Sequence, residues 1–184
     1  MAAEQMAAIG TVRLTVAQDG FTTREFPGPD GPTRLYVSGG EFVREVGGEP
    51  HATPLTIAAG PAFDASAAAC LYAWWSLGAQ VLDALVAAPG EQRSDVVLWP
   101  EHFDVGTTLT LADARHLNFG FSPGDDFCAE PYVYAGPWES VDGPFWNAPF
   151  GAYRTYTEIA ASSDPSSAAA GFLAEAREIY GASA

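Results

Sequence analysis

The stretch VVLWPEHFDVGTTLTLADARHLNFGFSPGDDFCAEPYVYAGPW, residues 96–138, decides the fold that we expect for this chain. Residues 105–111 form a strand-like run, and apolar and polar residues alternate along 116–121. Between them, Ala112-Asp113-Ala114-Arg115 combines small residues with an acid and suits a turn. The sequence therefore predicts an antiparallel hairpin here.

Further short strands are predicted on the N-terminal side of this hairpin. Residues 33–37 and 41–46 are joined by Ser38-Gly39-Gly40, and Gly-Gly is favourable in a hairpin turn. Strands are also expected at 9–16 and 55–59, with a loop at 51–54 between two prolines. Residues 1–8 are expected to be frayed or disordered, or partly helical.

Two helices complete the predicted fold. Residues 64–88 carry apolar side chains at helical spacing, and we interpret Trp74 and Trp75 as core, with a place in a ligand cavity as the alternative. The second helix begins near Asp164-Pro165, a cap followed by a first-turn proline, and ends near Tyr180. We predict one α+β domain, 1–184, in which two α-helices cover one face of a mainly antiparallel β-sheet.

Composition excludes several classes of function. The formal net charge is −15, and all 8 basic residues are Arg. Without Lys we expect neither a pyridoxal-phosphate site nor a P-loop nucleotide site, and no other cofactor is indicated. The acidity argues against nucleic-acid and anionic-membrane partners. It favours a cation, an amine or a basic protein partner, and a homo-oligomer remains open.

The N-terminus has no basic segment followed by a long apolar one, so no signal peptide is predicted. We expect a cytoplasmic protein with two free thiols, Cys70 and Cys128. The uncharged run within 65–82 is diluted by Ala, Ser and Gly, which argues against a membrane helix.

Titratable residues cluster in the stretch 101–130. If residues 101–104 are extended, His102 and Asp104 share a face and can act as a general base with its orienting acid, or merely as a structural pair. His116 is expected near His102 across the sheet. The catalytic candidates are His102, Asp104 and His116, and the weaker metal-ligand candidates are His102, Asp104, Asp125, Asp126 and Glu130.

Aromatic residues are concentrated in the same part of the chain. Of 23 aromatic residues, 13 lie between Trp99 and Tyr156, so either the core or an aromatic-lined pocket is concentrated there. The loop 139–151 is either a lid over that pocket or a packed loop. The ligand-binding candidates are Trp99, Glu101, Phe119, Tyr132, Tyr134, Trp138 and Trp146.

Four sequence words together resemble a family of uncharacterised actinobacterial proteins: LWPEHFDVG (98–106), FGFSPGDD (119–126), EPYVYAGPW (130–138) and FWNAPFGA (145–152). The resemblance extends from Asp64 to the C-terminus. That family has no assigned activity, so the resemblance implies a bacterial domain of unknown function and assigns no catalytic residue.

Three hypotheses of function follow. The first is a small-molecule-binding domain with an aromatic-lined pocket between the sheet and the loop 139–151, in which His102, Asp104 and His116 supply polar groups. The second is a metal-assisted or His-dependent hydrolase or isomerase built on the same residues. The third is an acidic interaction protein that binds a basic partner.

Overall fold

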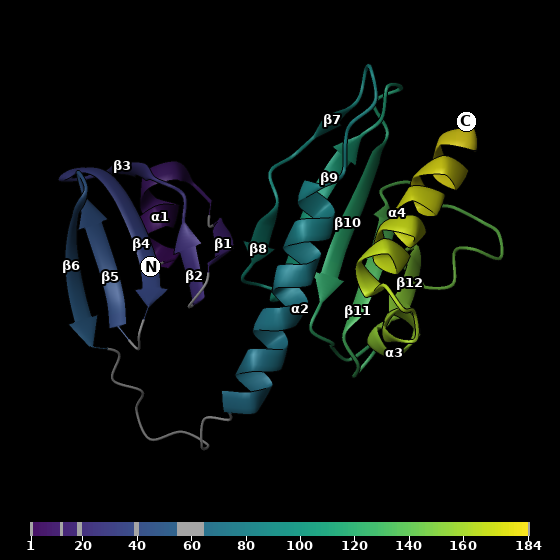
Figure 1. Cartoon of the computed structure of the whole chain (residues 1–184). Helices are drawn as coiled ribbons and strands as arrows, with labels where there is room; N and C mark the ends of the chain where they lie inside the picture. The colour runs from purple at the N-terminus through teal and green to yellow at the C-terminus, as the bar shows by residue number, and fades with distance from the viewer. Residues whose placement is uncertain (1, 12, 18–19, 39–40, 55–64, 184) are drawn as a thin grey trace. The chain divides into compact units, whose positions relative to one another are not determined.

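The computed structural model describes residues 2–11, 13–17, 20–38, 41–54 and 65–183 (Figure 1). The chain that we predicted as one domain divides into two compact units, residues 1–72 with 97–101 and residues 73–96 with 102–184. Every strand pair described is antiparallel, so the predicted α+β fold with a mainly antiparallel sheet is confirmed.

The first unit is a sheet of short strands with one helix. Its strand order is β8-β1-β2-β4-β5-β6, and β3 pairs with β4. Its elements are α1 (Ala2–Ile9), β1 (Leu14–Ala17), β2 (Gly20–Thr23), β3 (Phe26–Gly28), β4 (Gly31–Ser38), β5 (Glu41–Val46), β6 (Glu49–Pro54) and β8 (Val97–Trp99).

Several expectations for the first unit need correction. The N-terminal segment forms α1, and the buried Gln5 side chain fixes it by bonding both backbone groups of Arg13. The predicted loop at 51–54 belongs to strand β6, which tolerates Pro50 and Pro54 because it is an edge strand in the described sheet. The predicted hairpin of 33–37 and 41–46 is confirmed as β4 and β5. The strand expected at 55–59 lies outside the described residues.

The second unit contains the antiparallel hairpin predicted over residues 105–121. Its strand order is β12-β11-β10-β9, and the short β7 pairs with β9. Helices α2 and α4 both lie over one face of this sheet, as predicted (Figure 1). Its elements are α2 (Ala65–Asp83, in this unit from residue 73), β7 (Gln92–Arg93), β9 (Asp104–Thr110), β10 (His116–Ser122), β11 (Tyr132–Pro137), β12 (Ala152–Thr155), α3 (Tyr156–Ala160) and α4 (Pro165–Ala182).

The core of the second unit lies between the helices and this sheet. Trp74 and Trp75 are each only 4% exposed, so they are core residues. The indole of Trp74 donates a hydrogen bond of 2.7 Å to the Ser122 carbonyl and packs at 5.1 Å from the Phe121 ring. No helix in the described parts of the chain is long and apolar enough to span a membrane.

Strand register divides the sheet of the second unit into a helix side and an open side. Phe121 pairs with Val105 on β9 and Val133 on β11, and all three lie on the helix side. Side chains at the alternating positions, including Asn118 and Tyr134, therefore point to the other face. Among the described residues of this unit, no helix covers that open side.

Candidate functional site

The Asp104 side chain lies at the start of β9 on the open side of the sheet. It is buried, with 6% of its surface exposed. Its Oδ2 atom accepts a hydrogen bond from the Tyr134 hydroxyl, whereas its buried Oδ1 atom has no hydrogen-bond partner among the described residues. An unpaired buried acceptor costs about 1–3 kcal/mol of stability, so this carboxylate calls for a partner.

An unusual backbone conformation precedes Asp104. Residues 100–103 form a turn, and Phe103 has a φ of 60°, a value that disfavours residues with a Cβ. The turn places the Phe103 ring 4.6 Å from Trp75, whose indole bonds the Phe103 carbonyl at 3.0 Å. The expected extended segment 101–104 is therefore wrong, and strand alternation does not relate His102 to Asp104.

The missing side chain of Gly120 allows Tyr134 to reach Asp104. Gly120 on β10 pairs directly with Tyr134 on β11, and a Cβ at position 120 would overlap the tip of the Tyr134 ring. The tyrosine ring can therefore lie across the middle strand only because a glycine stands there.

A second carboxylate binds a second tyrosine beside the first pair. Asp125 Oδ2 accepts a hydrogen bond of 2.7 Å from Tyr132, and its Oδ1 accepts two backbone amides of its own turn. Burial acts to raise the pKa of Asp125, but these hydrogen bonds together hold the pKa below its ordinary value. The exposed His102 lies close enough to lower the pKa of both Asp104 and Asp125 by its charge.

Aromatic rings from two connecting segments surround these tyrosines. The Phe150 ring lies 6.2 Å from Tyr132 and 6.1 Å from Tyr134, and Phe127 lies 5.0 Å from Phe150. Tyr153 contacts Phe127 and Tyr132 at 5.1 and 5.8 Å. We call this group the aromatic–acid cluster; its members are Asp104, Asp125, Phe127, Tyr132, Tyr134, Phe150 and Tyr153.

The ionisation of the cluster reflects its burial. Burial raises the pKa of Asp104, and the Tyr134 hydrogen bond offsets this only in part. Burial and the adjacent Asp104 charge raise the pKa of Tyr134 well above its ordinary value, so this hydroxyl remains a donor at neutral pH. Burial likewise raises the pKa of Tyr132.

We expect Asp104→Asn to stabilise the protein at neutral pH by about 1 kcal/mol, because Asn is neutral and burial disfavours the charged form of Asp104. The folded-state pKa of Asp104 lies above the unfolded value, so stability falls as the pH rises from the unfolded pKa through the folded one. Asn keeps an acceptor for Tyr134 but does not titrate. The advantage of the variant should therefore grow from about pH 4 upward, as measured by urea unfolding at a series of pH values.

The neighbouring, exposed Asp126→Asn serves as the control and should change stability little at any pH. The assignment of a buried, poorly compensated carboxylate would be contradicted in two cases. The first is a difference in the free energy of unfolding between Asp104→Asn and the natural chain that stays constant with pH, and the second is a natural chain that is the more stable of the two.

The expected approach of His116 to His102 does not occur. His116 pairs with Thr110 at the far end of β9, because the turn at 111–115 sets the register of the hairpin. Six residues of strand, about 20 Å, separate Thr110 from Asp104. His116 instead contacts Trp138 at 4.4 Å and Thr110 Oγ1 at 3.0 Å through Nδ1.

The other ligand-binding candidates lie in different parts of the fold and do not form one site. Phe119 is buried on the helix side and is a core residue, so its assignment to a ligand site is wrong. Trp138 lies on the open side and is 63% exposed. Trp99 and Glu101 belong to the first unit, and both side chains are exposed.

The metal candidates are not assembled into one site. Glu130 bonds the Thr157 amide at the start of α3, Asp125 is bound by Tyr132, and Asp126 is exposed. Within the described ranges, no group of three or more His, Cys, Asp and Glu side chains is placed to hold a metal ion.

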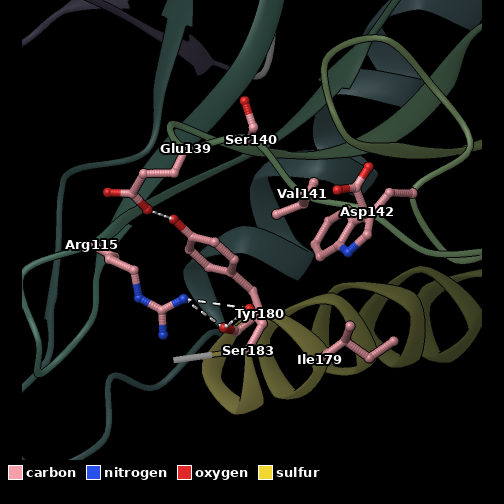
Figure 2. Close-up of a pocket in the computed structure, with 9 residues that line it drawn as sticks. Arg115, Glu139, Ser140, Val141, Asp142, Ile179, Tyr180 and Ser183 are labelled. Carbon is pink, nitrogen blue, oxygen red and sulfur yellow. Dashed lines mark hydrogen bonds between the residues drawn. The ribbon is translucent and has the colours of Figure 1, made fainter.

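A separate groove of about 380 Å³ lies beside the C-terminal end of α4 (Figure 2). It contains Trp146, the remaining ligand-binding candidate, whose ring lies 6.3 Å from that of Tyr180. Its lining residues are Arg115, Glu139, Ser140, Val141, Asp142, Trp146, Ile179, Tyr180 and Ser183.

The main polar groups of this groove already bind one another. Arg115 donates to Asp113 at 2.8 Å and to the Tyr180 carbonyl at 2.9 Å, and its guanidinium lies over the Tyr180 ring (Figure 2). The Tyr180 hydroxyl donates to Glu139, and burial first, then this bond, raises the pKa of Tyr180 to about 12. These contacts attach the end of α4 to the sheet, so the groove is the weaker candidate for a binding site.

Four members of the aromatic–acid cluster were candidates from the sequence, namely Asp104, Asp125, Tyr132 and Tyr134. Phe127, Phe150 and Tyr153 were not singled out, although they belong to the aromatic-rich third of the chain. No sequence pattern indicated a role for Gly120, because that role depends on Tyr134, its partner on the neighbouring strand β11.

Comparison with known proteins gives no relative: no family model, curated protein or solved structure matches this chain. The resemblance to uncharacterised actinobacterial proteins therefore stays a prediction, and the function is argued from geometry.

Proposed function

We propose that the second unit is a small-molecule-binding domain whose ligand contacts the aromatic–acid cluster. The observation that carries this proposal is the buried Asp104 carboxylate, whose Oδ1 has no partner among the described residues. A ligand that donates a hydrogen bond to Oδ1 would remove the cost of that unpaired acceptor.

The surroundings of Asp104 support the same proposal. Binding sites for small molecules combine aromatic walls with a few convergent polar groups. The cluster has five rings, two carboxylates and three tyrosine hydroxyls, of which two donate to those carboxylates. Phe127 and Phe150 are 43% and 37% exposed, so they offer apolar surface to a ligand.

A thermal-shift screen of cationic, neutral and anionic small molecules against the whole chain tests the proposal. At a ligand concentration 100 times Kd, binding stabilises by about 2.7 kcal/mol, which raises Tm by about 5–10 °C. We expect Phe127→Ala with Phe150→Ala to reduce this shift by more than half. Val86→Ala removes an apolar side chain that is more exposed, at 80%, and lies outside the cluster, and it should leave the shift unchanged.

If a compound still stabilises the variant that lacks Phe127 and Phe150 but no longer stabilises Trp146→Ala, the binding site is the groove beside α4 and not the cluster. A library in which no compound stabilises the chain would refute small-molecule binding by this unit.

Acid–base catalysis is the second candidate function. Asp104 and Asp125 have pKa values displaced in opposite directions, an arrangement that suits one carboxyl as an acid and the other as a base. Release of p-nitrophenol from p-nitrophenyl esters and glycosides, lost in both Asp104→Asn and Asp125→Asn, would support it. Absence of any release would leave the binding function alone.

A further inference from the structure

The arginines of the second unit do not neutralise the aromatic–acid cluster. Arg93 lies 3.8 Å from Asp83, Arg115 is bound to Asp113, Arg154 lies over the Phe172 ring, and Arg177 is bound to Glu91. His102 is the base whose charge acts on the two carboxylates, and its side chain is exposed.

The Tyr134 hydroxyl, the Asp104 backbone and the charge of the exposed His102 lower the pKa of the buried Asp104 carboxyl, but no described group donates a hydrogen bond to its Oδ1 atom. A buried charge that lacks an opposite charge is strongly unfavourable, and a neutral ligand would not supply that charge. A hard metal ion would need six or more oxygen ligands, whereas no cluster of three acidic or metal-binding side chains occurs among the described residues.

The rings around Asp104 favour a positive organic group as well. Aromatic faces attract ammonium groups through the negative charge of their π-systems, and the attraction is stronger where water is excluded. The Tyr134 ring, whose hydroxyl bonds Asp104, has its centroid 6.1 Å from those of both Tyr132 and Phe150, so aromatic rings are concentrated beside this carboxylate.

We infer that the ligand of this site is an organic cation, a protonated amine on an apolar or aromatic body, whose ammonium group binds Asp104 Oδ1. This inference rests on the proposed function and specifies the ligand class. Phe127 and Phe150 are partly exposed and contact each other beside Tyr132 and Tyr134, so they are the members of the cluster that would contact the apolar body of such a ligand.

Isothermal titration with charged and neutral counterparts tests the inference. The probes are benzylamine against benzyl alcohol, and phenethylamine against 2-phenylethanol, titrated into the whole chain at pH 7. We expect at least one amine to bind ten times more tightly than its alcohol, because an ammonium group supplies the opposite charge as well as a hydrogen bond to the carboxylate, whereas a hydroxyl supplies only the hydrogen bond.

Two variants distinguish a specific contact with Asp104 from general attraction by the negative charge of the protein. Asp104→Asn should weaken amine binding at least tenfold, whereas Asp126→Asn removes the same charge from an exposed neighbouring position and should change binding less than twofold. Unfolding curves of both variants show that each remains folded.

The outcomes distinguish this inference from the proposed function. Equal binding of amine and alcohol, or amine binding that Asp104→Asn leaves unchanged, overturns the cation inference while a small-molecule site persists. If neither kind of probe binds and the wider screen finds no stabilising compound, the proposed function fails together with the inference.

Discussion

Gly120→Ala should destabilise the second unit by about 3 kcal/mol and weaken ligand binding at the aromatic–acid cluster at least tenfold. A Cβ at position 120 would overlap the Tyr134 ring, and forced overpacking of this kind costs about 1–3 kcal/mol. The displaced tyrosine would also leave Asp104 without its hydroxyl donor, and a second unpaired oxygen adds about 1–3 kcal/mol.

Urea unfolding followed by tryptophan fluorescence measures this effect, since four of the five tryptophans belong to the second unit. The double variant Gly120→Ala with Tyr134→Ala is the control, because removal of the ring makes room for the new methyl group. We expect it to be at least 1 kcal/mol more stable than the sum of the single effects predicts. Additive effects would show that Gly120 is not required for the placement of Tyr134.

The hairpin of β9 and β10 and the helices α2 and α4 could be predicted from sequence because local signals agreed with the tertiary structure, whereas β7, β11 and α3 were not predicted. The turn at 112–115 lies between two strand-like runs, and β9 and β10 form the hairpin expected there. The cap of the last helix was also readable: Asp164 accepts the Ser167 amide and Pro165 begins α4.

The candidate site could be predicted only in part, since its geometry depends on register and on strained backbone. Asp104, Tyr132 and Tyr134 could be named as candidates because acidic and aromatic residues are concentrated within residues 96–138. It misplaced His116, because the hairpin puts the first residue of β10 opposite the last residue of β9. It also missed the positive φ of Phe103, which no local pattern indicates.

The close approach of α2 to the sheet leads to the second large prediction. Gly78→Ala should destabilise the second unit by about 2 kcal/mol, although Ala is normally favoured over Gly in a helix by about 1 kcal/mol. A Cβ at position 78 would lie 2.6 Å from Phe121 Cγ and 2.8 Å from its Cβ. These atoms lie next to the backbone of β10 in a fully buried side chain, so they cannot rotate away.

The helix must then shift away from the sheet, and overpacking of about 1–3 kcal/mol or more outweighs the gain in helix propensity. The shift should also lengthen the bond from the Trp74 indole to the Ser122 carbonyl, which near-UV circular dichroism detects. Gly171→Ala in α4 is the matched control, because a Cβ there meets no atom within 4 Å. The control should stabilise the unit by up to about 1 kcal/mol, so the two substitutions should act with opposite signs. If both stabilise the protein equally, α2 does not pack on Phe121 as closely as the structure describes.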